Sequence, residues 1–395
     1  MKTIYQKTIY ASFVGYIIQA VINNFAPLLF LTFQTSYNIS LSKITMLVTV
    51  NFGLQLVIDL LAVGFVDKIG YRISIVASHV FSAVGLVALT FLPELFSDPF
   101  IGLLISVVIY AVGGGLLEVL ISPIVEACPS ENKEKTMSLL HSFYCWGQVG
   151  VVLFSTVFFT FVGIGNWKIL ALIWAIIPVI NGLVFCKVPI VPLVGDDEQG
   201  LTIQELFKNK MFWILMLIML CAGASEQSVS QWASTFAQLG LGVNKTIGDL
   251  AGPMVFAAMM GISRVFYGKY GHKINLNRFM ILSAVMCIVS YLIITLTPGS
   301  FFGLLGLGLC GLSVGILWPG TFSSASAAIS GGGTSMFALL ALAGDLGCSA
   351  GPTLVGLVSG AANDNLKIGI LIGLIFPITL VIGFLIKRKH EKISI

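Results

Sequence analysis

The stretch GGGLLEVLISPIVEACP, residues 113–129, is apolar enough to lie inside a lipid bilayer, and yet it contains the carboxylate of Glu118. Placing a charged side chain at the centre of a bilayer costs about 2.5–3.5 kcal/mol on insertion scales. Such a residue therefore usually faces a water-filled cavity or a partner side chain. Ala111, Gly115 and Ser122 share the helical face of Glu118, at steps of three and four residues. Their small size suits a face that lines a cavity or lets another helix approach.

The composition of the whole chain supports a membrane location. Of its 395 residues, 57% are hydrophobic and 10% are charged, whereas soluble domains carry about 25% charged residues. Apolar runs of about 20 residues, each long enough to cross a bilayer as a helix, recur along the whole sequence. The first run, near 9–33, is too long for the core of a signal peptide and is interpreted as a retained span. The seven cysteines lie scattered in such runs without ligand spacing, which predicts neither disulfides nor a metal site.

Twelve apolar runs qualify as membrane-spanning helices. When the amino terminus is placed in the cytoplasm, 17 of the 21 Lys and Arg residues fall on the cytoplasmic side. This bias predicts a multi-pass protein of the cytoplasmic membrane with both termini in the cytoplasm. The predicted spans lie near 9–33, 42–65, 73–93, 99–125, 136–162, 167–187, 211–238, 247–267, 278–297, 301–328, 333–360 and 366–386.

The longest polar stretch, 194–210, falls at the midpoint of the chain. We interpret it as a cytoplasmic linker between an amino-terminal bundle, 1–193, and a carboxyl-terminal bundle, 211–395. The two halves carry traces of duplication, because DKIGYR at 67–72 corresponds to GKYGHK at 268–273. Parallel repeats with a binding site between them are typical of transporters. The predicted fold is an all-α membrane protein with twelve transmembrane helices in two pseudo-symmetric six-helix bundles.

The segment GFVDKIGYR, residues 64–72, resembles the loop signature of the major facilitator superfamily. The glycines permit a tight turn and close helix approach, while the acidic and basic residues form a charge cluster on the cytoplasmic side. The resemblance implies the twelve-helix fold of that superfamily, transport by alternating access, and a gating role for this loop. Five residues fill the positions of the signature: Gly64, Asp67, Lys68, Gly70 and Arg72.

Two further segments resemble the fucose:proton symporter family of sugar permeases. In the fourth span, a glycine-rich run leads to Glu118 and then to a Ser-Pro pair, similar to the Glu and Asn-Pro of that family. In the fifth span, LLHSFYCWG at 139–147 is similar to the family's Leu-Leu-His-aromatic pattern and includes His141. This resemblance implies a proton-coupled sugar importer.

The first span departs from that family, which places an acid there. This chain offers only Gln19, Asn23 and Asn24, which argues against a mechanism with two carboxylates in the amino-terminal half. Asp59, a short way before the Gly64 turn, is expected to join the cytoplasmic charge cluster.

Polar side chains inside the predicted spans are the candidates for a functional site. Each also has a structural interpretation, because Asn, Gln and Ser in membrane helices often bond a neighbouring helix. The candidates for proton coupling are Glu118, Glu226 and Asp345. The candidates for substrate binding are Gln19, Asn23, Asn24, Glu118, His141, Gln148, Glu226, Gln227, Gln231, Trp232 and Trp318.

The charges of these candidates indicate a class of substrate. Three acids lie deep in the predicted spans, whereas no Lys or Arg does, and Arg264 is expected to reach the inner membrane surface. An anionic substrate would need a compensating cation, so a neutral polyol such as a sugar is favoured. We therefore expect symport of a small neutral solute, driven by the proton gradient. Glu118 would take up a proton on one side of the membrane and release it on the other.

Other functions remain as alternatives. The first is export of cationic or amphipathic compounds, with Glu226 and Asp345 as the cation partners. A second is a membrane sensor that binds a ligand without moving it. An enzyme is disfavoured because no arrangement at catalytic spacing occurs, and nucleic-acid binding has no support. No bound cofactor is expected, and a monomer would suffice because each chain contains both halves.

Overall fold

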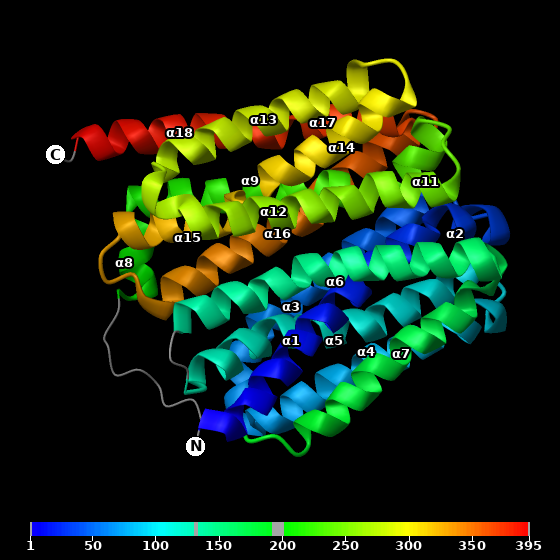
Figure 1. The fold of residues 1–395 in the computed structure, drawn as a ribbon, viewed down its shortest axis with the longest axis horizontal. Helices are drawn as coiled ribbons and strands as arrows, with labels where there is room; N and C mark the ends of the chain where they lie inside the picture. The colour runs from blue at the N-terminus through cyan, green and yellow to red at the C-terminus, as the bar shows by residue number, and fades with distance from the viewer. Residues whose placement is uncertain (1, 130–132, 192–200, 394–395) are drawn as a thin grey trace. The chain divides into compact units, whose positions relative to one another are not determined.

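The computed structural model describes residues 2–129, 133–191 and 201–393. Every element in these residues is a helix. The chain divides into two compact units, Met1–Val194 and Gly195–Ile395. In each unit the long helices run roughly side by side (Figure 1).

The helices confirm the predicted spans. Twelve helical segments are long and apolar enough to cross a membrane, six in each unit, and each overlaps one of the twelve predicted runs. The elements of the amino-terminal unit are α1 (Lys2–Asn24), η1 (Ala26–Leu29), α2 (Phe30–Tyr37), α3 (Leu41–Ile69), α4 (Tyr71–Leu95), α5 (Pro99–Ala127), α6 (Lys133–Val162), η2 (Ile164–Asn166) and α7 (Trp167–Phe185).

The carboxyl-terminal unit has more broken helices. Two of its segments, η3 and η4, are π-helical and interrupt the seventh and eighth spans. Its elements are α8 (Ile203–Lys208), α9 (Lys210–Ser230), α10 (Ala233–Thr235), η3 (Phe236–Gly240), α11 (Lys245–Asp249), η4 (Leu250–Met254), α12 (Val255–Tyr270), η5 (Gly271–Lys273), α13 (Leu276–Leu296), α14 (Ser300–Val314), α15 (Leu317–Ala328), α16 (Gly333–Ala361), α17 (Leu366–Gly373) and α18 (Ile375–Ile393).

The helices begin where the sequence offers a capping side chain. Asp98 accepts a hydrogen bond from the backbone of Phe100 and precedes Pro99, which suits the first position of α5. Asn209 and Asn275 cap α9 and α13 in the same way. These side chains satisfy amide groups that the first turn of a helix leaves without a partner.

The polar stretch at the chain midpoint contains a short helix. Residues 192–200 lie outside the described part of the chain, so the predicted linker at 194–210 is described only from 201 onward. There Thr202 and Glu205 form a capping box at the start of α8. The hydrogen bonds that Glu205 accepts from Thr202 hold the pKa of its carboxyl below the usual range.

The same pairs of spans pack together in both units. In the amino-terminal unit α1 contacts α5, α6 and α7, while α5 contacts α3 and α4. In the carboxyl-terminal unit α9 contacts α14, α16 and α18, while α14 contacts α12 and α13. The tenth span, Ser300–Ala328, begins and ends 201 residues after the fourth span, Pro99–Ala127. Matched packing at a nearly constant offset indicates that the two units arose by duplication.

Close packing of α9 against α16 depends on glycine. A Cβ atom added at Gly347 would lie 1.9 Å from the carbonyl oxygen of Leu220, and one added at Gly223 would lie 2.3 Å from that of Gly344. Small residues let backbones approach in a bilayer, where helices associate by packing and not by the hydrophobic effect. The absence of a side chain at these positions therefore sets the distance between the two helices.

A buried histidine joins three helices of the amino-terminal unit. His79 in α4 is 1% exposed, and its Nδ1 lies 2.6 Å from the carbonyl oxygen of Ile75, to which it donates. Its Nε2 therefore accepts from Asn181 Nδ2 of α7 at 2.8 Å, and the same amide donates to Ala11 O of α1 at 3.0 Å. This arrangement requires a neutral imidazole with its proton on Nδ1.

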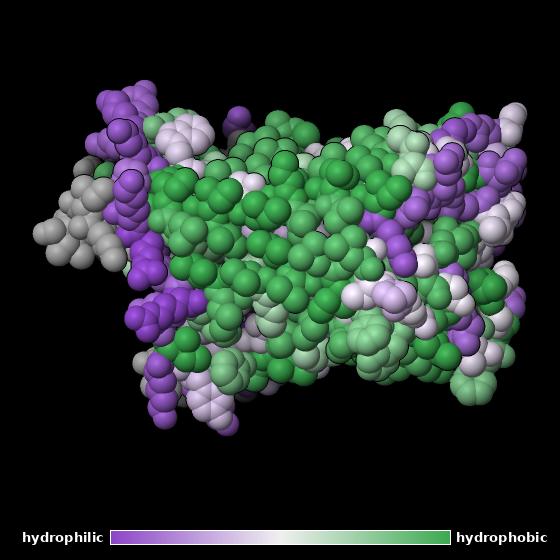
Figure 2. Space-filling model, turned by 90° about the horizontal axis from the view of Figure 1, so that it is seen from above, coloured by the Kyte–Doolittle hydropathy of each residue, from purple (hydrophilic) through white to green (hydrophobic). Residues whose placement is uncertain are grey.

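The surface matches a bilayer. In the space-filling view (Figure 2), hydrophobic residues cover the middle, and hydrophilic residues gather toward the two ends of the helices. On α7, for example, Ile176, Val179, Ile180 and Leu183 are each more than half exposed. The hydrocarbon core of a membrane accepts such a surface without cost, whereas water does not.

We expect Gly347→Ala to lower the free energy of unfolding by about 1–3 kcal/mol, because the added methyl group meets a backbone carbonyl that cannot move without displacing α9. The melting temperature of the purified protein in detergent measures the loss. Gly150→Ala in α6 is the control, since a Cβ at Gly150 meets nothing within 4 Å. Equal melting temperatures for the two variants would contradict the packing argument.

Candidate functional site

Glu118 in α5 is held by a glutamine of the first span. Gln19 Nε2 donates to Glu118 Oε2 at 3.2 Å and to Gln55 Oε1 of α3 at 2.9 Å. One amide group therefore links α1, α3 and α5. The hydrogen bond lowers the cost of placing the carboxylate among apolar helices, because a buried charge needs a donor to replace water.

The link continues as a cluster of buried amides between α1 and α3. Gln55 Nε2 donates to Asn23 Oδ1 at 2.9 Å and to Asn51 Oδ1 at 3.0 Å. Asn51 in turn donates to Asn23 Oδ1 at 3.1 Å. All four amide side chains, with Gln19, are at least 94% buried. The structure thus brings the predicted residues Gln19, Asn23 and Glu118 together.

Asn51 and Gln55 are absent from the sequence-based candidates. The signal that would have found them is the recurrence of Asn51, Gln55 and Asp59 at every fourth position of the second span, which places all three on one helical face. Asp59, the third residue on this helical face, does not lie where the sequence predicted. One of its carboxylate oxygens lies within 4.8 Å of one of Glu118, so the expectation that Asp59 belongs to the cytoplasmic charge cluster is wrong.

Both acids are partly exposed and lie well inside their helices. Asp59 stands ten residues before the end of α3, and Glu118 stands nine residues before the end of α5, which runs parallel to α3. At 1.5 Å per residue, these positions are about 14–15 Å from the helix ends. α3 and α5 have 29 residues each, so each acid lies about a third of the helix length from the end.

Tyr16 connects His141 to the helix of Glu118. The hydroxyl of Tyr16 lies 2.9 Å from Ser122 Oγ, one turn after Glu118. Its ring packs beside the imidazole of His141 of α6, with 5.4 Å between the ring centres. His141 is itself exposed. It therefore lies beside the group around Glu118, next to the ring of Tyr16.

The two remaining candidates of this unit, Asn24 and Gln148, are both buried. Asn24 Nδ2 donates to Ala20 O of its own helix at 2.9 Å and to Tyr144 Oη of α6 at 3.5 Å. Gln148, also on α6, is 2% exposed.

The superfamily signature lies mostly inside helices and not in a loop. α3 continues to Ile69, α4 begins at Tyr71, and Gly70 between them has φ of 94°, which favours glycine. Lys68 is exposed, and Arg72 donates to the carbonyl oxygen of Phe185 at 2.7 Å, which ties the turn to the end of α7. The surroundings of Gly64 and of the Asp67 side chain lie outside the described part of the structure.

In the carboxyl-terminal unit, three candidates form a chain along α9. Gln227 Nε2 donates to Glu226 Oε1 at 3.1 Å, and Gln231 Nε2 donates to Gln227 Oε1 at 3.1 Å. The three residues, side chain and backbone together, are at most 8% exposed. The chain of hydrogen bonds therefore ends at the carboxylate of Glu226, which accepts from the amide of Gln227.

Arg264 of α12 compensates that charge, and this corrects a second expectation. Its guanidinium lies 3.7 Å from Glu226 Oε2 and donates from Nε to Gly315 O at 3.1 Å. The side chains of Arg264 and Glu226 are 19% and 10% exposed. The predictions that Arg264 reaches the membrane surface, and that no basic residue lies deep, are therefore wrong. A long side chain turns inward when a buried acid and a carbonyl offer it partners.

The two tryptophan candidates take part in helix packing. Trp232 is fully buried, and its indole Nε1 donates to Pro352 O of α16 at 3.0 Å. The ring of Trp318 lies against Gly344, where an added Cβ would meet its Cη2 at 2.3 Å. Asp345 follows Gly344 on α16 and is partly exposed.

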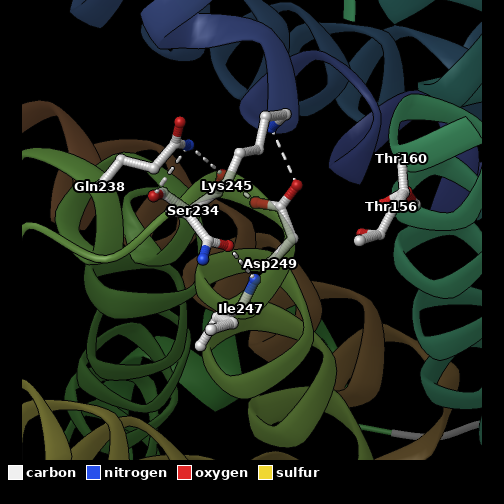
Figure 3. A network of polar contacts seen from close by, with 8 residues as sticks. Thr156, Thr160, Ser234, Gln238, Lys245, Ile247 and Asp249 are labelled. Carbon is white, nitrogen blue, oxygen red and sulfur yellow. Dashed lines mark hydrogen bonds and ion pairs between the residues drawn. The ribbon is translucent and has the colours of Figure 1, made fainter. Parts of the chain in front are cut away.

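Asp249 is a further buried acid, and it is absent from the sequence-based candidates. Figure 3 shows its carboxylate between Lys245 and Ser234. Lys245 Nζ lies 2.8 Å from Asp249 Oδ2, Ser234 donates to Oδ1, and Gln238 Nε2 donates to Ser234 Oγ at 3.2 Å. Asp249 is fully buried. The i,i+4 spacing of Lys245 and Asp249 is the feature of the sequence that would have predicted this ion pair. The network joins α11 to α10 and to the π-helical segment η3.

Comparison with known proteins supports this architecture. The family model described as Major Facilitator Superfamily matches residues 10–352. Among curated proteins, none matches this chain. The structure resembles that of the E. coli fucose:proton symporter, with 17% identity, a TM-score of 0.66, and coverage of 97% of this chain and 99% of that chain.

Two other solved structures are similar. A nucleoside transporter shows 15% identity, a TM-score of 0.72, and coverage of 98% of this chain and 99% of that one. A bacterial homologue of the human lysosomal transporter Spinster, in an inward-facing and occupied conformation, shows 14% identity, a TM-score of 0.75, and coverage of 98% of both chains. Identities this low indicate a shared fold.

We expect Glu226→Gln and Arg264→Gln to destabilise the protein singly, because each leaves its partner without a compensating charge. The double variant should be less destabilised than the sum of the two, with a coupling of about 1–3 kcal/mol. Thermal unfolding in detergent measures the cycle. The exposed pair Lys43–Asp98 serves as control. For that pair, the destabilisation of the double variant should equal the sum of the two single variants. Additivity for Glu226 and Arg264 as well would contradict an interaction between them.

Proposed function

The chain belongs to the Major Facilitator Superfamily, and from that premise we propose that it imports a small neutral polar solute, a sugar or related polyol, by proton symport. The observation that carries the proposal is the contact of Glu118 with Gln19 at the edge of a buried amide cluster. A protonatable acid lies there among neutral groups that both donate and accept hydrogen bonds. Proton-coupled transport of a hydroxyl-rich solute requires an acid that can bind and release a proton, and neutral groups that can form hydrogen bonds with the solute hydroxyls.

The charge balance favours a neutral solute. In the carboxyl-terminal unit, the carboxylates of Glu226 and Asp249 each have a basic partner, Arg264 and Lys245. Each pair sums to zero, so neither offers an uncompensated charge to a charged substrate. Fucose and nucleosides, which two of the structurally similar transporters carry according to their names, are polar solutes of the same general kind.

Asp59 supplies a second acid to the proposed coupling site. Two negative charges within 4.8 Å repel each other by about 3 kcal/mol at an effective dielectric constant of 20. One proton on the pair removes most of that repulsion, and Glu118 is its proposed carrier. The resembled symporter family has its further acid in the first span. Here the second span provides it, and the first span contributes the amide of Gln19 instead.

The remaining features of the proposal follow from the sequence. The proton gradient is the energy source and no bound cofactor takes part. Both termini lie in the cytoplasm, and a single chain suffices because it contains both halves of an alternating-access carrier. Glu118 and Asp59 are proposed for proton coupling, and Gln19 and Asn23 for contact with the solute.

A thermal-shift screen of the purified protein against sugars, nucleosides and organic cations identifies a solute to test. In proteoliposomes with an imposed pH gradient, Glu118→Gln should abolish accumulation of that solute, because the variant has no proton to release. Counterflow exchange should persist, since exchange needs no net proton movement. Full accumulation by the variant would remove Glu118 from coupling. Extrusion of cations would favour the exporter, and binding without flux would favour the sensor.

Asp59→Asn tests the second acid. Removing its negative charge makes Glu118 release its proton more easily, so the pH above which accumulation fails should fall by roughly one to two units. Accumulation assays across a pH series measure this shift. The matched control is Glu126→Gln, which removes an exposed acid of the same helix α5 and should leave the pH profile unchanged. An unshifted profile for Asp59→Asn would show that the two acids titrate independently.

A further inference from the structure

A small basic cavity lies where α13 begins and α18 ends. It has a volume of about 170 Å³ and presents two guanidinium groups, two amides and one apolar side chain. No residue of this cavity belongs to the proposed transport site. Its lining residues are Asn275, Asn277, Arg278, Ile281 and Arg388.

A third cation stands beside the cavity. Lys387 is only 3% exposed, and its Nζ donates to Asn277 Oδ1 at 2.7 Å. Among the described side chains, no carboxylate bonds Arg278 or Arg388. The two guanidinium groups that line the cavity attract an anion. The planar guanidinium groups and the amide donors suit the oxygens of a phosphodiester.

Each arginine continues an exposed apolar stripe. On α13, Leu282, Val285 and Val289 follow Arg278 at steps of four, three and four residues, and each is at least 40% exposed. On α18, Ile378, Ile382 and Leu385 lead to Arg388 at steps of four, three and three residues, and are also at least 40% exposed. Because α13 and α18 are in contact, the two stripes run on neighbouring helices.

We propose that this cavity binds the headgroup of an anionic phospholipid, whose acyl chains lie along the two stripes. A phosphate ion or a soluble anion would use the cavity alone and would gain nothing from the apolar residues beyond it. A lipid can contact both, because its charged headgroup would bind the arginines while its acyl chains lie on the apolar stripes that continue from them. Basic pockets between membrane helices are known to select anionic headgroups.

Binding of phosphatidylglycerol and of phosphatidylcholine with identical acyl chains to the purified full-length protein tests the proposal. Native mass spectrometry in a neutral detergent gives the two affinities. Wild-type protein should bind phosphatidylglycerol roughly tenfold more tightly. The double variant Arg278→Gln, Arg388→Gln should lose that preference. The single variant Arg388→Gln, in the exposed last turns of α18, should lose part of it and covers the case in which the double variant fails to fold.

The matched control is the double variant Lys208→Gln, Lys210→Gln, which removes two exposed basic residues elsewhere in the same unit and should keep the full preference. An excess of inorganic phosphate should not displace the lipid. Three results would overturn the proposal: equal affinity of the wild-type protein for the two lipids, equal loss of preference in the control, or displacement of the lipid by phosphate.

Discussion

The bilayer core offers no hydrogen-bond partners, and the positions of the polar side chains in this chain follow from that constraint. A polar group inside a span must find its partner on another helix or on its own backbone. Gln19 bonds Glu118 and Gln55, Trp232 bonds the carbonyl of Pro352, and the Tyr291 hydroxyl bonds the carbonyl of Ser225. These bonds hold the helices together, and some of the same groups are available for function.

The two units meet the constraint differently. In the carboxyl-terminal unit two buried acids have basic partners, Glu226 with Arg264 and Asp249 with Lys245. In the amino-terminal unit Glu118 meets the amide of Gln19 and a second acid, Asp59. A fixed cation favours the charged form of a carboxylate, whereas a second acid nearby disfavours it. This difference is the reason for proposing that proton coupling belongs to the amino-terminal unit.

Duplication explains how the units can share a framework and differ in chemistry. The helix pairs that pack together are the same in both units, and glycine allows close approach on corresponding spans, with Gly115 against α3 and Gly315 against α12. Trp318 of the tenth span stands 200 residues after Glu118 of the fourth and packs on Gly344. Packing positions have therefore been retained while the polar positions have diverged.

The sequence alone determined the twelve spans and the all-helical fold, because length and hydrophobicity are local properties that a bilayer tests segment by segment. It also identified Gln19, Glu118 and Glu226, since a polar residue in an apolar run is conspicuous without any knowledge of its neighbours. Only the tertiary structure decided what those residues meet. Asp59 reaches Glu118 because α3 packs beside α5 at Gly115, and Arg264 turns inward because Glu226 and Gly315 lie within its reach. Such contacts join residues far apart in the chain, and their distances are set by how helices pack and not by the composition of any one of them.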